Sequence, residues 1–431
     1  MKHIKQNHLI PIIFLLALII RLIFVIPSEN IPSSDAANYD RLGLSLSKGL
    51  GYADNNSTPH SYCPPFYPFF LSVIYKIFGH SYPAVRVIQS IIGALICVFI
   101  YLAARKVCAV RVGLWSAFIS MAYPPFIKSA ELLLTELFFT FVLVLIVFYL
   151  LEIQEGAGLK KCAILGLLLG VSSLTRPVML LFPFFIIPVF IHSPATGGLS
   201  IPPKEPRALA RVGSIYSNRM SLPKMLKKYS VVLLFFSLVI LPWVARNYSI
   251  YHKFVLVSTH GGATLYSSYC PPKGIFGMLA TAEDPIMAEA SRISSPVEQS
   301  DFLTKKTIDF IKNNPAKVCV LELKKILYLW APFDWEIVGG RWFNFIYVIA
   351  LPFFAIGFLF AVRRLKIFYP ILLPIIYFQI MTLIFYGSPR FRLPLEPYLF
   401  ILAIIGVMAT GKYISRKKGN KYDDICNNSG L

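Results

Sequence analysis

The sequence predicts an all-α protein that crosses a membrane several times as a bundle of about ten helices. Of its 431 residues, 56% are hydrophobic and 15% are charged, whereas a soluble domain has about 25% charged residues. Several segments are nearly uncharged apolar runs of the roughly 17–20 residues that a helix needs to cross a bilayer. Lys and Arg gather between these runs. A single water-soluble domain and a disordered chain are both excluded.

Ten apolar runs are predicted to cross the membrane. The first follows Lys2 and Lys5 and is interpreted as a retained anchor, because no small-residue cleavage site comes after it. The two runs on either side of Arg176 and Pro177 are short. The ten runs are 9–27, 84–104, 112–128, 132–151, 162–175, 177–192, 230–245, 343–361, 367–386 and 394–411.

The distribution of basic residues orients this bundle. If the N-terminus is cytoplasmic, the inside segments carry 22 of the chain's 42 Lys and Arg residues, which follows the positive-inside rule. The sequence therefore predicts a multi-pass protein of the plasma (inner) membrane, with both termini in the cytoplasm and the candidate site on the extracytoplasmic side. The inside segments are 1–8, 105–111, 152–161, 193–229, 362–366 and 412–431.

The long predicted loops divide the chain into three parts. Residues 1–245 form an N-terminal transmembrane module, and 28–83 is its first outer loop. Residues 246–342 are predicted to form an extracytoplasmic domain with interfacial helices, because their charge is mixed. Within them, 318–333 suits either a helix at the membrane surface or a buried helix of the outer domain. Residues 343–431 form a C-terminal transmembrane module and a cytoplasmic tail.

Charge and cysteine content exclude other classes. The net charge of +21 belongs to the loops rather than to a nucleic-acid interface, because there is no basic helix, zinc finger or aromatic and basic stripe. No two of the seven cysteines have C-x-x-C spacing, and no metal ligand is predicted. Cys63 and Cys270 lie in a repeated Ser-Tyr-Cys-Pro-Pro, both outside in this topology. A disulfide between them and a coincidence both stay open.

Asp35 lies about eight residues after the first apolar run, at the predicted outer surface of the membrane. One interpretation makes it the first-turn acid of a helix that Ser34 caps. The other makes it a carboxylate that takes a proton from an attacking hydroxyl, or holds an acceptor group, where headgroups meet water. The next charged residues, Asp40 and Arg41, are predicted to form a solvated local pair.

Glu136 lies about one turn inside the apolar run 132–151. A carboxylate at this depth is costly unless it faces a polar cavity, so Glu136 is a candidate site residue. Glu131, five residues earlier and about 140° around a helix, is interpreted as a surface residue. Arg176 either faces the same cavity as Glu136 or extends its side chain to the interface.

Arg390 and Arg392 occupy a short outer turn, where basic residues run against the positive-inside trend. A lipid phosphate is one predicted partner, because Arg binds phosphate through paired donors, and the alternative is Glu396 or an acid of an outer loop. Arg86 is a third phosphate candidate, and Tyr62 opens an aromatic, proline-rich stretch that suits the interface. Together these residues predict one outer cavity with carboxylates and arginines, which fits transfer of a group from a phosphorylated lipid.

A series of short motifs runs in order over nearly the whole chain: Ser34-Asp35-Ala36-Ala37-Asn38-Tyr39, Pro64-Pro65-Phe66-Tyr67-Pro68-Phe69-Phe70-Leu71 with Phe78-Gly79, Leu134-Thr135-Glu136, Leu174-Thr175-Arg176-Pro177, Trp243-Val244-Ala245-Arg246-Asn247-Tyr248, Phe254-Val255-Leu256-Val257-Ser258-Thr259-His260-Gly261-Gly262 and Arg390-Phe391-Arg392-Leu393-Pro394-Leu395-Glu396-Pro397. In these motifs the chain resembles the polyprenyl-phosphate-dependent glycosyltransferases of the GT-C fold. It is similar in particular to the bacterial family-39 relatives of protein O-mannosyltransferases and of the lipid A aminoarabinose transferase.

The resemblance implies a GT-C-like transmembrane bundle that transfers a sugar from a polyprenyl-phosphate donor with inversion. Asp35 would be the general base and Glu136 the second acid of the cavity. No cofactor is implied with certainty, although a divalent metal is allowed. The acceptor would be a lipid, a glycan or a protein, and membrane lipids but no nucleic acid would be further partners. The implied substrate-binding residues are Tyr62, Arg86, Arg176, His260, Arg390 and Arg392.

Two positions depart from the family pattern. Many relatives have a basic residue where Cys63 stands, so a different residue is expected to hold the donor phosphate. Relatives often have Asn where His260 stands, which leaves the role of this segment open. Two other functions also stay open. One is a polymerase or ligase of lipid-linked glycans. The other is a lipid or small-molecule transporter, although transporters place polar sites near the midplane and often contain repeats.

Overall fold

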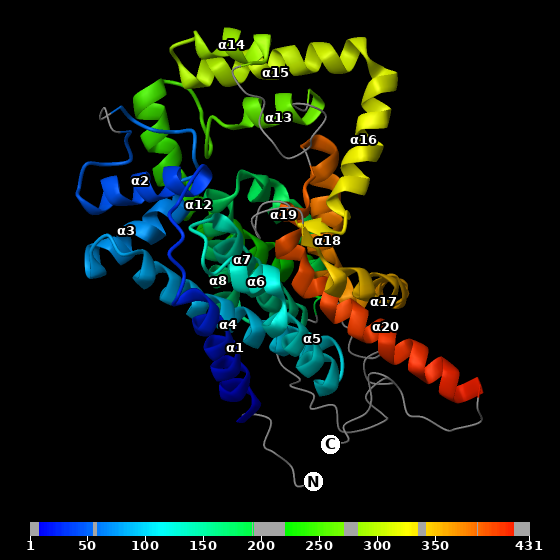
Figure 1. Cartoon of the computed structure of the whole chain (residues 1–431). Coiled ribbons are helices and arrows are strands. Elements are labelled where there is room, and N and C mark those ends of the chain that lie inside the picture. The colour runs from blue at the N-terminus through cyan, green and yellow to red at the C-terminus, as the bar shows by residue number, and fades with distance from the viewer. Residues whose placement is uncertain are drawn as a thin grey trace.

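The computed structural model describes residues 8–54, 58–191, 193, 220–270, 283–334, 342–385 and 387–417. This part of the chain is helical apart from loops and one small antiparallel pair of strands, β1 (Phe333–Asp334) and β2 (Trp342–Phe343). The predicted all-α class is confirmed (Figure 1).

The first half of the chain supplies the helices that carry most of the candidate site. In chain order they are α1 (Leu9–Val25), α2 (Asp35–Ser47), α3 (Phe66–Phe78), α4 (Tyr82–Val107), α5 (Val110–Ala122), α6 (Pro124–Lys128), α7 (Thr135–Gln154), α8 (Leu159–Thr175), the 3-10 helix η2 (Pro177–Leu181), α9 (Phe182–Phe185) and α10 (Ile187–Ile191).

The second half supplies the outer helices and the last spans. In chain order they are α12 (Leu222–Tyr251), α13 (Gly261–Tyr269), α14 (Pro285–Ser291), α15 (Pro296–Asn313), α16 (Pro315–Leu329), α17 (Phe345–Val362), α18 (Leu365–Ile384), α19 (Pro389–Arg392), the 3-10 helix η4 (Leu393–Leu395) and α20 (Glu396–Lys417).

Six helical segments of the described chain are long and apolar enough to cross a membrane. They are α4, α7, α12, α17, α18 and the continuous segment Pro389–Tyr413, and they coincide with six of the ten predicted runs. The count of about ten spans stays a prediction. The run 112–128 is divided between α5 and α6, and 177–192 is divided into η2, α9 and α10. Prolines begin or interrupt these pieces, because proline lacks a backbone donor and disrupts a helix interior.

The bundle has a buried centre and an exposed periphery. Side chains of α4, α7, α18 and α20 are mostly buried, whereas few of those on α12 and α17 are buried. Two glycines bring α17 and α20 into close contact. A Cβ on Gly357 would lie 1.8 Å from the Leu402 carbonyl oxygen, and one on Gly406 would lie 1.9 Å from that of Phe353. Only glycine fits at this crossing.

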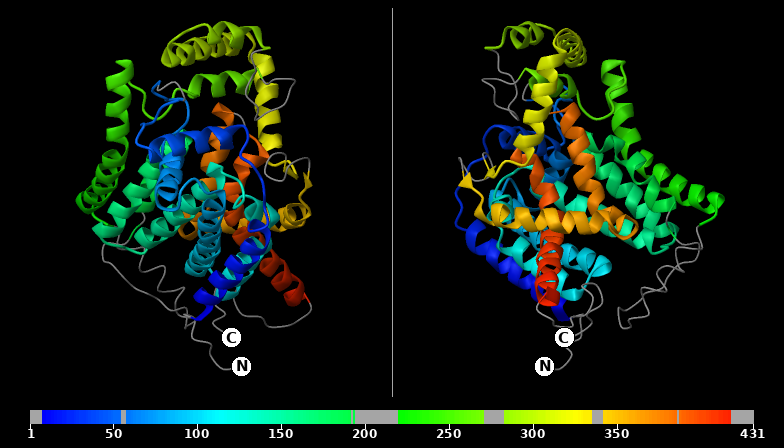
Figure 2. Two further views of the ribbon diagram at one scale, coloured as in Figure 1. Left: turned by 60° about the vertical axis from the view of Figure 1, so that its left-hand side comes forward. Right: turned by 90° about the vertical axis from the view of Figure 1, so that its right-hand side faces the viewer.

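A layer made of α13, α14, α15 and α16 covers one end of the bundle, and α16 descends from it beside α18 (Figure 1). α2 and α3 lie toward the same end. The views in Figure 2 agree, and they show the start of α1 and the end of α20 at the opposite end of the molecule. The candidate site lies between the bundle and this outer layer.

Candidate functional site

Asp35 is the first residue of α2, and half of its side chain is exposed. The preceding Ser34 has a φ of 52°, a backbone conformation that non-glycine residues rarely adopt and that occurs at functional sites. The Ser34 side chain accepts no capping hydrogen bond, so the predicted serine cap is wrong. Asp35 itself is the first-turn acid that the sequence predicts.

Glu136 lies in the first turn of α7 and is 1% exposed. Its Oε1 accepts a hydrogen bond from Arg390 Nε and forms an ion pair with Arg176 Nη2 at 2.9 Å. Among the described residues, no group donates a hydrogen bond to its Oε2. A buried carboxylate is stable here because two guanidinium groups compensate its charge.

Arg390 joins the two carboxylates. Its Nη1 and Nη2 both lie 3.2 Å from Asp35 Oδ2, while its Nε is bonded to Glu136. The structure therefore brings together residues from α2, α7 and α19 that are far apart in the sequence. We call Asp35, Glu136, Arg176 and Arg390 the acid–arginine cluster. Its two negative and two positive charges balance.

Arg176 follows α8 and is held by buried contacts. Its guanidinium lies 5.2 Å from the ring centroids of both Phe139 and Phe391, and its Nη2 donates to Thr135 Oγ1 at 3.1 Å. Arg176 therefore lies against Glu136, as the first of the two interpretations of the sequence requires, rather than extending to the membrane surface. The aromatic rings and the hydroxyl fix the guanidinium plane, as such contacts do for arginine.

Tyr39 is a cluster neighbour that the sequence argument missed. It lies one helical turn after Asp35, on the same face of α2, and its ring packs edge-on against Tyr67 at 5.4 Å. Burial raises the pKa of its hydroxyl well above the usual value, and the nearby Cys63, Asp35 and Glu136 add to the effect. The hydroxyl therefore stays protonated and can donate a hydrogen bond. The i, i+4 spacing from Asp35 is the signal that could have identified it.

His260 and Tyr62 pack against each other near Asp35. His260 precedes α13, and its ring meets that of Tyr62 edge-on at 4.2 Å. Burial lowers the pKa of His260 to about 4, although the Asp35 carboxylate opposes this shift. The imidazole is therefore neutral at pH 7, with one nitrogen able to donate and one able to accept a hydrogen bond.

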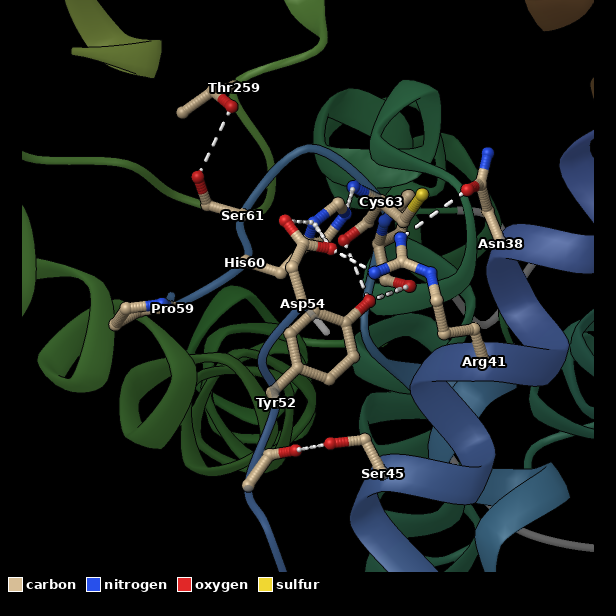
Figure 3. A network of polar contacts seen from close by, with 12 residues as sticks. Asn38, Arg41, Ser45, Tyr52, Asp54, Pro59, His60, Ser61, Cys63 and Thr259 are labelled. Carbon is tan, nitrogen blue, oxygen red and sulfur yellow. Dashed lines mark hydrogen bonds and ion pairs between the residues drawn. The ribbon is translucent and has the colours of Figure 1, made fainter. Parts of the chain in front are cut away.

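A network of polar contacts orders the outer loop that carries Tyr62 (Figure 3). Arg41 pairs with Asp54, which also accepts from His60 Nδ1 at 3.3 Å. The Cys63 backbone N–H donates to His60 Nε2 at 3.1 Å, so the ring proton is assigned to Nδ1. Burial acts to raise the pKa of Asp54, but the hydrogen bonds from Arg41 and His60 outweigh it and hold the pKa below its usual value.

The predicted pair of Asp40 and Arg41 is wrong. Asp40 instead accepts hydrogen bonds from the hydroxyls of Tyr75, at 2.5 Å, and Tyr82, at 3.0 Å, and it pairs with His80. Consecutive residues on a helix point in different directions, and each of these two has a better partner on another segment.

The C-terminal end of α12 contacts two loops, the one that carries Tyr52 and His60 and the one that carries Val257. Arg246 donates to the carbonyl oxygens of His60, at 2.8 Å, and Tyr52, at 3.0 Å. On the other side, Trp243 Nε1 donates to the Val257 carbonyl oxygen at 2.7 Å. The loops also meet directly, because the Thr259 N–H donates to the Ser61 carbonyl oxygen at 2.9 Å. These contacts bring Tyr62 and His260 to the same place.

Arg86 does not join the acid–arginine cluster. It is buried, and it donates to the carbonyl oxygens of Ser28 and Asn30 and, at 3.4 Å, to that of Glu131. Its donors therefore fasten the chain that follows α1, which differs from the phosphate-binding role that the sequence predicts. Glu131 is also buried rather than a surface residue, because it accepts hydrogen bonds from Ser28 and Lys128.

Arg392 points away from the cluster. It is fully buried and pairs with Glu396 at 3.0 Å, which is the alternative partner that the sequence allows. Cys63 and Cys270 are free thiols rather than a disulfide. In the described part of the chain, no group of three or more His, Cys, Asp or Glu residues is arranged to hold a metal ion.

The model of a family described as dolichyl-phosphate-mannose-protein mannosyltransferase matches residues 62–202. No curated protein is similar enough in sequence to match the chain.

Two structures of one enzyme resemble the chain in fold, and a third solved structure matches it with a lower score. The archaeal oligosaccharyltransferase AglB from Archaeoglobus fulgidus, in complex with an inhibitory peptide and a dolichol-phosphate, is 14% identical with a TM-score of 0.55, over 98% of this chain and 53% of that chain. The apo form of the same enzyme is 15% identical with a TM-score of 0.55, and the match covers 98% of this chain and 54% of that chain. ArnT from Cupriavidus metallidurans, bound to undecaprenyl phosphate, is 17% identical with a TM-score of 0.42, and the match covers 97% of this chain and 82% of that chain.

The chain therefore has the GT-C fold of polytopic membrane glycosyltransferases, as its motifs predict. It spans about half the length of the archaeal oligosaccharyltransferase that it matches.

Proposed function

We propose that the protein is a membrane glycosyltransferase. It transfers a sugar from a polyprenyl-phosphate-linked donor to an acceptor on the extracytoplasmic side, with inversion at the anomeric carbon. The observation that carries this proposal is the single arginine, Arg390, that bridges the carboxylates of Asp35 and Glu136. The GT-C fold supports the reaction class.

The orientation in the membrane is part of the proposal. The cluster lies near the end of the bundle that α13 to α16 cover, opposite the start of α1 and the end of α20 (Figures 1 and 2). The excess of Lys and Arg in the segments that the sequence predicts to be inside supports cytoplasmic termini, and the plasma membrane would deliver the lipid-linked donor to the end that carries the cluster.

Asp35 acts as the general base in this mechanism. An acceptor hydroxyl or amine attacks the anomeric carbon and gives its proton to the Asp35 carboxylate. The bond between the anomeric carbon and the phosphate oxygen breaks, and polyprenyl phosphate leaves with the electron pair. Asp35 suits this task better than Glu136, because half of it is exposed whereas Glu136 is buried between two arginines.

Arg390 stabilises the charge that develops on the leaving phosphate. Without a donor, its Nη1 and Nη2 atoms are occupied by Asp35. A phosphate that binds Arg390 competes for these donors and releases the Asp35 carboxylate for the acceptor. Glu136 and Arg176 keep the guanidinium in place during the exchange through buried contacts. The base thus becomes available when the donor is bound.

Tyr62 and His260 are proposed to bind the sugar or the acceptor. An aromatic ring beside a neutral imidazole offers an apolar face and both a donor and an acceptor, which suits a hydroxyl-rich ligand. Tyr39 adds a protonated hydroxyl on the Asp35 side. Arg86 and Arg392 are assigned structural rather than substrate-binding roles, because backbone carbonyls and Glu396 take up their donors.

The proposal is tested by incubating the purified protein with undecaprenyl-phosphate-linked sugars and measuring the release of undecaprenyl phosphate. The wild type is expected to release it, and Asp35→Asn is expected to lose at least about 100-fold in turnover, the usual scale for a general base. Asp40→Asn is the matched control, because Asp40 lies on the same helix and contacts Tyr75 and His80 instead.

Two outcomes contradict the proposal. Full turnover by Asp35→Asn excludes this residue as the base. Accumulation of intact sugar lipid inside vesicles, without release of undecaprenyl phosphate, makes the protein a transporter.

A further inference from the structure

The two arginines of the turn 387–395 face opposite sides of it. Arg390 and Arg392 lie two residues apart in α19, about 200° around the helix axis. Arg390 reaches Asp35 and Glu136, while Arg392 is 0% exposed. A fully buried arginine is costly unless its charge and donors are satisfied, so the contacts of Arg392 indicate what it does.

Arg392 connects three helices to the turn. Its Nε donates to Glu396 Oε1 at 3.0 Å, at the start of α20, and its guanidinium lies 3.8 Å from the ring centroid of Tyr347 in α17. Its Nη1 donates to the carbonyl oxygens of Leu329, at 3.0 Å, and Ala331, at 2.6 Å. These carbonyls lie at the C-terminal end of α16, where a helix lacks internal partners and attracts a cation.

The start of the turn is also packed against α16. A Cβ on Gly387 would lie 3.0 Å from the Lys325 carbonyl oxygen and 3.2 Å from Leu329 Cβ, so the backbone passes too close for a larger residue. The outer helix α13 joins here as well, because the Tyr269 hydroxyl donates to the Leu383 carbonyl oxygen at 3.2 Å and its ring lies 3.7 Å from Lys325 Nζ. The turn is thus packed against α16, and α13 contacts the end of α18 just before the turn.

We propose that Arg392 is a positioning residue that fixes the turn so that Arg390 meets the two carboxylates and the donor phosphate. The inference rests on the proposed function for its catalytic consequence, although the fixing of the turn is independent of it. Arg390 must bridge Asp35 and Glu136 at hydrogen-bond distance, and displacement by about 1 Å costs a catalytic group much of its effect. The position of Arg390 therefore depends on α16 through Arg392.

The guanidinium shape is essential to this role. A planar fork satisfies a carboxylate and two carbonyls at once, whereas the ammonium of a lysine is a single point charge on a flexible chain. Arg392→Lys keeps the charge and removes the fixed geometry. A loss of function in Arg392→Lys would therefore come from the lost geometry and not from a lost charge.

The test combines hydrogen exchange with donor binding. In Arg392→Lys, the backbone amides of Arg390 and Phe391, which are bonded to Ser388, are expected to exchange faster. Affinity for undecaprenyl phosphate is expected to fall about tenfold, and kcat/KM per folded molecule to fall with it. Glu396→Gln removes the negative charge that faces Arg392 but keeps an oxygen that can accept its hydrogen bond, and it is expected to change both quantities in the same direction by less.

Arg21→Lys is the matched control. Arg21 is also fully buried, in α1, where it donates to the Ala17 carbonyl oxygen and to Cys97, far in sequence from the turn. It is expected to leave donor affinity and exchange at 388–392 unchanged, even if it lowers thermal stability.

Two results overturn the inference: unchanged exchange and affinity in Arg392→Lys, or an equal loss of affinity in Arg21→Lys. Faster exchange at the turn in a protein whose wild type releases no undecaprenyl phosphate supports the positioning role and contradicts the proposed function.

Discussion

At the scale of single residues, the site is organised by one arginine with two kinds of partner. Arg390 makes a buried contact with Glu136 and an exposed contact with Asp35. The buried contact is held on its other side by Arg176. An exposed ion pair contributes only about 0.2–1 kcal/mol, so a phosphate can displace Asp35 from Arg390 far more easily than it can displace Glu136.

His260 makes the stability of the protein depend on pH. Its pKa is lowered from 6.5 to about 4 by burial, so the unfolded chain takes up the proton first as the pH falls. Stability is then complete above pH 6.5 and decreases as the pH falls from 6.5 to 4. Burial lowers the pKa of His60 too, with the same sign.

The measurement is the unfolding temperature across this pH range for the wild type and for His260→Asn. The variant is expected to show a smaller decrease between pH 6.5 and 4. Equal slopes for the two proteins would show that His260 does not stay neutral in the fold.

At the scale of elements, the start of α7 separates two carboxylates of different function. Glu136 belongs to the acid–arginine cluster, while Glu131, five residues earlier, pairs with Lys128 and Ser28, each at 2.7 Å. Both are buried and both are paired with basic side chains. Only Glu136 contacts the proposed catalytic residues.

Substitution of each by glutamine distinguishes these roles. Glu136→Gln leaves two arginines without their carboxylate and is expected to destabilise the protein by about 3 kcal/mol and to abolish most turnover. Glu131→Gln is expected to lower the unfolding temperature while the turnover of the folded fraction stays near that of the wild type. Loss of turnover in both variants to the same extent would contradict a specific role for Glu136.

The sequence predicts elements better than it predicts contacts. The apolar runs of α4, α7, α12, α17, α18 and α20 are long and uninterrupted, so length and composition suffice to identify them. The runs 112–128 and 177–192 have the same composition, but prolines divide them into short helices. A hydropathy profile alone does not distinguish a continuous helix from a run that prolines divide.

Contacts of single side chains depend on the rotation of a helix and on its neighbours, which a single sequence does not contain. Arg390 and Arg392 are alike in the sequence, yet one faces the cluster and the other the end of α16. The depth of Glu136 in an apolar run predicted a buried charge, which the structure shows, while its role in the site stays a prediction. Tyr39 was missed because a tyrosine near a membrane surface is common.

At the scale of the whole molecule, the outer layer and the membrane bundle meet at the site. α12 holds the loops of Tyr62 and His260 through Arg246 and Trp243, and α16 holds the arginine turn through Arg392. The cluster therefore combines parts that are fixed separately, from the first outer loop, the central α7 and the last span. In the proposed function, the membrane-embedded donor and the acceptor meet where these parts join.

The central claim, that Asp35 and the donor phosphate share Arg390, is tested most directly by a double-mutant cycle on the binding of undecaprenyl phosphate. Asp35→Asn alone is expected to tighten binding by about two- to fivefold, the scale of an exposed ion pair, because it frees Arg390. Arg390→Gln alone is expected to weaken binding, and adding Asp35→Asn to it should restore little. An equal gain from Asp35→Asn in both backgrounds would contradict the claim, because the aspartate would then act independently of Arg390.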